Sequence, residues 1–348
     1  MKKAFLTLLL GMATGVLTAQ TSRTQLLQSA KNLTITLSGN KTYYYLVTAE
    51  QTYMMHRREG KVIIQRDTFD VASIKSMRFK ALPRFALNED STEISSGYSI
   101  DHGLVALRRT MNQNKWNTLV LPFTMTGREV RETFGEDAML AYARGITEDD
   151  VATVEFVTIP LNTEEIVIEA GNHYLIRPTK EPDVKAGEMT SVAYGNSRIY
   201  GPLYLIPNVM MASGQQMPNS PAIRSDKDQV RMRAKGTYVK QDLTPETRDL
   251  YLMNDDGRFA KIDETTTLKA FRSWLEVMRN PDQLPLRFYI DGIAEDITQD
   301  IHELMTTEND DDAPYYDLQG RKVSHRSSLL PPTSSKILIH NGKKIVVK

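Results

Sequence analysis

The fold is decided by the stretch Leu33–Val47, LTITLSGNKTYYYLV, in which apolar side chains occupy every second position on both sides of a turn. The turn falls at Ser38–Asn40, where serine, glycine and asparagine are residue types that favour a reversal of the chain. A period of two is typical of a strand that buries one face, so this stretch predicts a β-hairpin. Strand pairing, rather than helix packing, is therefore expected to be the basis of the fold.

Two more strand-like runs, Lys61–Ile64 and Phe69–Phe79, follow the hairpin. We therefore predict a small N-terminal β module over residues 20–84. The polar stretch Asn88–Gly97 comes next, and its composition is typical of a linker. A larger domain, residues 85–307, is expected to follow the small module.

The central domain repeats strand-like runs that are separated by turn residues. The runs are Gly103–Leu107, Trp116–Phe123, Ala152–Val157, Tyr174–Ile176 and Arg198–Ile206. Their β-branched and aromatic residues favour strands. We predict a mainly β protein whose central domain resembles a β-sandwich.

Helices are expected to be few in this domain. Arg128–Phe134 has an apolar pair, Val130 and Phe134, at i,i+4 spacing and stops at Gly135, which predicts a short helix. The segment Leu268–Met278 fits a helix by propensity and a strand by its aromatic and branched residues. We thus expect one or two short helices.

Two acidic loops are candidates for calcium sites. Arg248–Met253 and Arg258–Ile262 flank Asn254–Gly257, which predicts a hairpin with a four-residue loop. That loop and the run Asn309–Asp312 carry oxygen ligands of the kind that Ca²⁺ prefers. Neither has the alternating aspartates and distal glutamate of a dedicated calcium loop, so we interpret them as a turn and a solvated linker.

Residues 308–348 are predicted to form a C-terminal β-hairpin module behind an acidic linker. Asn341 and Gly342 lie between two β-branched runs in the final segment, Lys336–Lys348. A two-residue type I′ turn needs positive φ at both central positions, which asparagine and glycine tolerate. Asn341 and Gly342 are therefore the predicted turn.

The turn fixes the register of this last hairpin. If Asn341 and Gly342 are the two turn residues, the residues on either side of them, His340 and Lys343, must pair. The resulting apolar pairs, on opposite faces, are Leu338 with Ile345 and Ile337 with Val346. Two apolar faces need cover, so we expect the hairpin to pack on Tyr315–Leu318 and Arg321–Val323.

The first residues have the organisation of a secretory signal peptide, residues 1–19. Met1–Lys3 is basic, Ala4–Leu17 is uncharged and mostly apolar, and small Ala19 precedes polar Gln20. We therefore place the cleavage between Ala19 and Gln20. A buried N-terminal helix is the alternative. The apolar run is shorter than the roughly 20 residues of a membrane span, and no later stretch is long enough, so no transmembrane segment is predicted.

Positive and negative charges balance in this chain of 348 residues, with 43 Lys and Arg against 43 Asp and Glu. The cations are scattered along the sequence, whereas nucleic-acid binding needs them concentrated, so no nucleic-acid partner is expected. The chain has no Cys. Disulfides, thiolate nucleophiles, cysteine zinc sites and iron–sulfur clusters are thereby excluded.

The sequence has no motif that names a reaction or a cofactor. The six histidines never stand four residues apart, and neither a Gly-x-Ser-x-Gly elbow nor a phosphate loop or dinucleotide fingerprint occurs. Glu155, Glu164, Glu165 and Asp291 are carboxylates of the kind that a glycosidase uses in pairs, but a chain with 43 acids contains such residues by chance. We predict no catalytic residue, no metal site and no cofactor.

Tyrosine is the remaining clue, with 15 in the chain and three in a row at Tyr43, Tyr44 and Tyr45. Successive residues of a strand point to opposite faces, so Tyr44 is expected on the face opposite Tyr43 and Tyr45. Sugar rings stack on exposed aromatic rings, and protein interfaces favour tyrosine as well. The three tyrosines are therefore the ligand-binding candidates. The alternative is that Trp116 and most tyrosines pack the cores.

Three groups of motifs resemble the secreted, multi-module β proteins of Bacteroidota. The matching stretches are Leu33–Phe79, then Trp116–Phe123 with Gly171–Ile176 and Leu268–Arg272, then Tyr316–Val323 with Asn341–Lys348. The first is similar to a strand-rich repeat near the start of such proteins, and the second to a domain of unassigned function. The third is similar to their C-terminal tails.

The tail also resembles a short type IX secretion sorting domain, which implies the export machinery as a partner. It departs from that pattern where Ser335–Leu338 replaces the usual glycine, hydrophobic residue and tyrosine. A structural end-cap is the alternative.

These observations predict a non-catalytic exported protein, at the cell surface or secreted, that binds a glycan or a protein ligand, as an adhesion protein does. The periplasm is the alternative location. A glycan-active hydrolase of unfamiliar sequence and a structural subunit of a surface assembly are the alternative functions.

The mature protein is predicted to begin at or near Gln20. Intact-mass measurement on protein from the native cell should show a loss of about nineteen residues, because the three regions stand in the order that export requires. A mature chain that retains Lys2 and Lys3 would contradict the assignment.

Overall fold

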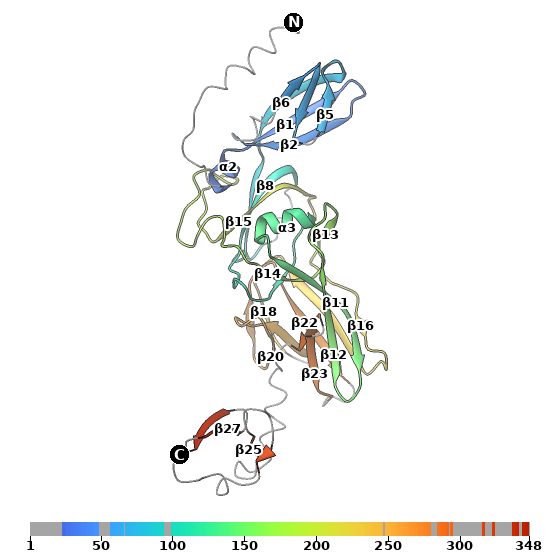
Figure 1. Ribbon diagram of the computed structural model, residues 1–348, viewed down its shortest axis with the longest axis vertical. Helices are drawn as coiled ribbons and strands as arrows, with labels where there is room; N and C mark the ends of the chain where they lie inside the picture. Colours follow the sequence, from blue (N-terminus) through green and yellow to red (C-terminus); the bar gives the residue numbers. More distant parts are fainter. Residues whose placement is uncertain are drawn as a thin grey trace. The chain divides into compact units, whose positions relative to one another are not determined.

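The computed structural model is a mainly β protein, which confirms the predicted fold class: strands make up 52% of it and helical residues 7% (Figure 1). It describes residues 23–48, 56–65, 67–93, 99–245, 248–279, 284–291, 293–294, 315–316, 322–323, 336–340 and 343–347. The predicted signal peptide, with Ala19 and Gln20, lies outside these residues. None of the helices within them is long and apolar enough to cross a membrane.

Two compact units divide the chain, Met1–Asp296 and Ile297–Lys348. The domain boundaries that we place at residues 84/85 and 307/308 stay predictions, and the second lies outside the described residues.

The N-terminal part of the first unit contains helix α2 (Arg23–Ser29) and two three-stranded sheets. The sheet order is β2-β1-β6 in one and β3-β4-β5 in the other. The strands are β1 (Lys31–Leu37), β2 (Thr42–Val47), β3 (His56–Arg58), β4 (Lys61–Ile64), β5 (Asp67–Asp70) and β6 (Ile74–Ala81). Leu33 pairs with Tyr45 and Ile35 with Tyr43, so the predicted hairpin is confirmed. A 3₁₀ turn at Val71–Ser73 separates β5 from β6.

Next comes a three-stranded sheet of order β15-β8-β7, in which β7 runs parallel to β8. It is followed by a six-stranded sheet of order β24-β23-β12-β11-β14-β9. The strands of these two sheets are β7 (Arg84–Asn88), β8 (Ile100–Arg108), β9 (Asn117–Leu119), β11 (Met139–Glu148), β12 (Ala152–Ile159), β14 (Tyr174–Arg177), β15 (Leu203–Met211), β23 (Leu286–Ile290) and β24 (Ile293–Ala294).

The short helix predicted from Arg128–Phe134 is confirmed as α3 (Gly127–Phe134). It begins at a capping box, in which the Thr126 hydroxyl accepts from the Glu129 N–H and the Glu129 carboxylate accepts from the Thr126 N–H. Strands β10 (Met125–Thr126) and β13 (Ile166–Ile168) pair beside the helix. Val130 and Phe134 are fully buried, which fixes the helix on the core.

A five-stranded sheet of order β16-β17-β22-β19-β20 completes the first unit, with the small pair β18-β21 beside it. The strands are β16 (Ile223–Arg224), β17 (Val230–Thr237), β18 (Gln241–Leu243), β19 (Asp249–Met253), β20 (Phe259–Ile262), β21 (Thr266–Leu268) and β22 (Arg272–Arg279). The hairpin of β19 and β20 is confirmed. The segment Leu268–Met278, which fits helix or strand by sequence, is mostly strand β22, because β17 and β19 pair with it on both sides.

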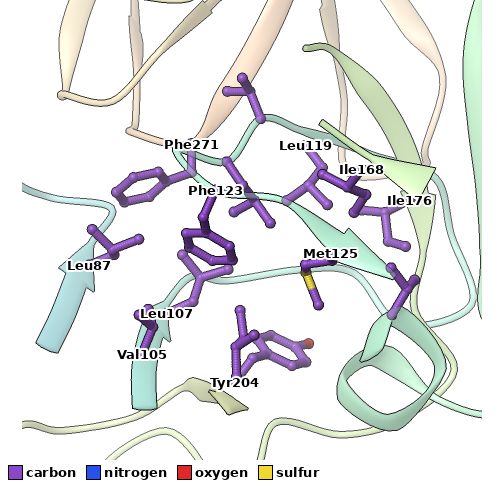
Figure 2. Packing of buried hydrophobic residues seen from close by; sticks show 14 of the residues in the cluster. Leu87, Val105, Leu107, Leu119, Phe123, Met125, Ile168, Ile176, Tyr204 and Phe271 are labelled. Atoms are coloured by element: carbon purple, nitrogen blue, oxygen red, sulfur yellow. The ribbon is translucent and has the colours of Figure 1, made fainter. Parts of the chain in front are cut away.

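Two large apolar clusters hold these sheets together. One lies between the six-stranded and five-stranded sheets and includes Val154, Phe156, Met232, Tyr251 and Leu275. The sheets therefore face one another as in a sandwich. The other cluster joins β7, β8 and β15 to α3 and β9. Figure 2 shows its side chains converging around Phe123 from these elements and from Phe271.

A buried polar cluster lies where these apolar clusters approach each other. Arg109 is fully buried, and its guanidinium donates to the carbonyl oxygens of Thr118 and, at 2.7 Å, of Phe271. Buried Glu89 accepts from Thr110 at 2.8 Å and from Arg272 at 2.7 Å. Burial raises the pKa of the Glu89 carboxyl, but Arg272 and the other donors outweigh it and hold the pKa below its ordinary value.

The second unit is one sheet of order β26-β25-β27-β28. Its strands are β25 (Tyr315–Tyr316), β26 (Lys322–Val323), β27 (Lys336–His340) and β28 (Lys343–Val347). The predicted register, His340 opposite Lys343, is confirmed, whereas the turn residues Asn341 and Gly342 lie outside the described residues. We expect β25 to cover the hairpin; the structure instead pairs it with the edge of β27, at Tyr316 and Ile339. Edge pairing satisfies backbone groups that a packed face would leave open.

Replacing Glu89 with Ala is predicted to lower the free energy of unfolding by about 3 kcal/mol, because it leaves partly buried cations without their shared acceptor. Replacing the neighbouring Asp90, whose carboxylate is more exposed and pairs with Arg108, should cost less than about 1 kcal/mol. Urea denaturation of both variants measures the difference. Equal midpoints would show that the buried cluster does not stabilise the fold.

Candidate functional site

The three predicted tyrosines divide between the two faces of β2. Tyr43 and Tyr45 pack against Phe69 with ring centroids 5.0 and 6.2 Å apart, and the Tyr45 hydroxyl donates to Asp67 at 2.5 Å. Burial and this hydrogen bond raise the pKa of Tyr45. These two tyrosines therefore pack the small module. Tyr44 lies on the other face and is 37% exposed, so the structure leaves Tyr44 as the ligand-binding candidate.

Tyr44 stacks on His102 of strand β8. The ring centroids are 4.2 Å apart and the ring planes differ by 12°. The imidazole Nδ1 lies 2.7 Å from Asn208 Oδ1, and Nε2 lies 3.7 Å from Asp101 Oδ1. Both ring nitrogens thus face polar groups, while one ring face covers Tyr44.

The backbone around His102 is shaped to make this contact. His102 and Asn208 have φ of 48° and 59°, the left-handed region that side chains other than glycine rarely adopt. The register of β8 with β15 shifts between Ile206 and Val209, which is a β-bulge at Asn208. At Gly103, an added Cβ would lie 2.9 Å from the Pro83 carbonyl oxygen, so the chain can pass only without a side chain.

We name Tyr44, His102, Asp101 and Asn208 the aromatic surface. It combines a partly exposed phenol ring with a carboxylate, whose side chain is 72% exposed, and an amide. Such a surface binds a sugar by packing C–H groups on the ring while hydroxyls bond to the polar groups. It is a platform rather than a cavity. Its chemistry suits binding.

The sequence pattern singles out Tyr44 as a candidate but not its three neighbours in the structure. His102, Asp101 and Asn208 are far from Tyr44 in the chain, and only strand pairing brings them together. Two local signals existed: Gly103 directly after the histidine, and an asparagine that interrupts the apolar run of β15. Both are cues for a bulge or a close backbone approach.

The other candidates have structural partners. Asn254 Oδ1 accepts from the N–H groups of Asp256 and Arg258, both at 3.0 Å, so the acidic loop closes the β19–β20 hairpin. Asn309–Asp312 lies outside the described residues. In the described part of the chain, no group of three or more His, Asp or Glu side chains is arranged to hold a metal ion.

Two of the four candidate carboxylates have side-chain partners in the described structure. Asp291 accepts from the Thr158 N–H and hydroxyl at 2.9 and 2.7 Å, and so fastens the chain after β23 to β12. Glu164 lies 3.3 Å from Arg128 beside α3, with Glu165 next to it on the surface. Glu155 faces Tyr289 in the β12–β23 pair.

His173 is a half-buried histidine whose pKa is lowered by its surroundings. Both ring nitrogens are buried, with no hydrogen-bond partner in the described structure, and a Cβ at Gly236 would lie 2.9 Å from its Cε1. Desolvation lowers the pKa of His173 to about 4. A neutral imidazole without a proton acceptor is a packing residue, so it offers no acid–base chemistry.

Comparisons of this chain with protein-family models, with curated proteins and with solved structures found no match.

His173 makes the stability of the protein depend on pH. Its pKa of about 4 in the folded state lies below the ordinary 6.5, so the unfolded state binds more protons as the solution is acidified. The free energy of unfolding is predicted to fall between pH 6.5 and 4, by about 2–3 kcal/mol from this residue. Urea denaturation across this range should show a flatter dependence in His173→Leu than in wild type. Parallel curves would contradict the prediction.

Proposed function

We propose that this chain is a non-catalytic exported protein that binds carbohydrate through the aromatic surface. The observation that carries the proposal is the stack of Tyr44 on His102, 4.2 Å between centroids, with an exposed carboxylate and an amide beside it. Aromatic rings flanked by hydrogen-bonding groups suit the alternating apolar and polar faces of a sugar.

The strained backbone supports a functional reading of this surface. His102 and Asn208 each hold a left-handed conformation, which costs on the order of 1–3 kcal/mol per residue and is concentrated at binding and catalytic sites. Here the strain directs one imidazole onto Tyr44. A purely structural contact between β2 and β8 could be made by residues of ordinary conformation.

The predicted export of this chain supports carbohydrate as the ligand. The basic, apolar and small-residue regions of residues 1–19, and the resemblance of the tail to a sorting domain, suggest a location at the cell surface or outside the cell. Polysaccharides are abundant there. A protein ligand is an alternative occupant of the same surface.

The alternative functions lack a comparable observation. A glycosidase needs two carboxylates beside the bound sugar, whereas the aromatic surface has one, Asp101, and the carboxylates of Asp291 and Glu164 are bound by Thr158 and Arg128. A surface-assembly subunit would present an open strand edge. In the sheet β2-β1-β6 both β2 and β6 are edge strands, and β6 carries Lys75, Arg78 and Lys80, which protect an edge from pairing with another chain.

Replacing Tyr44 with Ala is predicted to weaken carbohydrate binding at least about tenfold, because the ring supplies most of the apolar contact. Tyr142→Ala is the matched control, since Tyr142 is 42% exposed and lies on β11. Binding is measured on arrays of neutral and acidic glycans, with thermal unfolding to check that both variants fold.

Three results would contradict the proposal. They are the absence of any glycan ligand, an equal loss in both variants, and turnover of a bound glycan that is abolished by replacing carboxylates.

A further inference from the structure

A second surface lies on the outer face of the sheet β16-β17-β22-β19-β20, away from the sandwich core. Val230 and Met232 of β17 point into that core. The alternate residues Arg231, Arg233 and Lys235 therefore point outward. Three cations follow one another along a single strand face.

Three neighbouring hollows on this face share lining residues. The first is lined by Arg231, Arg233 and Arg248, and the second shares Arg248 and Glu276 with it. The third shares Trp274 with the second and adds Lys235. We name these hollows together the basic groove; its charged and aromatic residues are Arg231, Arg233, Lys235, Arg248, Trp274, Glu276 and Asp242, and the Asp242 carboxylate accepts from the Thr267 hydroxyl at 2.6 Å.

One acid organises the groove. The Glu276 side chain is 11% exposed, and its two oxygens lie 2.8 Å from Lys235 Nζ and 2.7 Å from Arg248 Nη1. Burial raises the pKa of Glu276, but the hydrogen bonds from Lys235 and Arg248 outweigh it and hold the pKa below its ordinary value. The ionised carboxylate thus holds Lys235 and Arg248 at the groove, and each of its two oxygens is bound by one of them.

Arg231 and Arg233 are left without an acidic partner in the part of the chain that the structure describes. Asp228, on the turn before β17, is paired with Arg224 at 3.0 Å. Arg233 is half-buried, so its charge is partly shielded from water and attracts an anion more strongly than an exposed one does. Two adjacent guanidinium groups can each hold an oxyanion through two parallel hydrogen bonds.

We propose that the basic groove binds an acidic polysaccharide. Carboxylate or sulfate groups of the polymer contact Arg231 and Arg233, and its sugar hydroxyls contact the polar residues farther along, such as Gln241 and Thr244. The elongated lining accommodates several sugar units rather than a single small anion. This site shares no residue with the aromatic surface.

The geometry disfavours two other polyanions. A single-stranded nucleic acid gains affinity by stacking its bases on open aromatic rings, but Trp274 in the groove is only 7% exposed. A peptide that binds by adding a strand to a sheet needs a free strand edge. The groove lies instead across the face of β17 and β22, whose backbone groups pair with each other.

The test compares dextran sulfate and polygalacturonate with uncharged dextran, polyglutamate and a thymidine oligonucleotide, by calorimetry on the full chain. Arg231→Gln combined with Arg233→Gln is predicted to weaken binding of the acidic polysaccharides about 100-fold, roughly tenfold for each charge-assisted contact. Arg144→Gln combined with Arg198→Gln is the matched control, because both residues are exposed and the net charge changes equally. The control pair should retain binding.

Preference for dextran sulfate or for polygalacturonate identifies the oxyanion as sulfate or carboxylate, and either supports the proposal. Failure of both to bind, an equal loss in the control pair, or tighter binding of polyglutamate or the oligonucleotide would overturn it. The Arg231→Gln and Arg233→Gln pair should leave binding of neutral glycans at the aromatic surface unchanged, so failure here is distinguishable from failure of the proposed function.

Discussion

The burial of one cation, Arg109, constrains the rest of the first unit. Its guanidinium has no access to water, and its two Nη atoms donate to the carbonyl oxygens of Thr118 and Phe271, whereas Nε has no hydrogen-bond partner in the described structure. A buried charge without such acceptors would be strongly destabilising, so these segments cannot separate. Phe271 adopts a φ of 61° to present its carbonyl, and the same oxygen accepts from the Val120 N–H. Two loops and the end of β8 are thereby joined at one point.

Both proposed binding surfaces lie on strands that leave this point. Strand β8 ends at Arg108, next to the buried cation, and carries His102 toward its beginning. Strand β22 begins at Arg272, which pairs with Glu89, and carries Glu276 in the basic groove. When one end of a strand is held in place, the positions of the side chains along the rest of the strand are fixed as well. The polar cluster therefore connects the stability of the fold to the placement of the candidate sites.

Local patterns predicted much of the fold, because hairpins and caps depend on neighbouring residues. The β1–β2 pairing, helix α3 and the register of β27 with β28 all follow from period, turn and capping residues. Contacts between distant segments were not predictable. Along the sequence the cations are scattered. Within strand β17, however, every second residue from Arg231 to Lys235 is a cation, so these three side chains lie in a row on one face of the sheet. Likewise, Tyr44 was found, whereas His102 reaches it only through sheet packing.

The central claim is that two separate surfaces of this β scaffold bind carbohydrate, and amide hydrogen exchange with and without ligand tests it most directly. A neutral glycan should protect Thr42–Val47 and Ile100–Arg108, whereas an acidic polysaccharide should protect Val230–Thr237 and leave the first two segments unchanged. Unchanged exchange with both ligands, or protection confined to β11 and β12, would contradict the account.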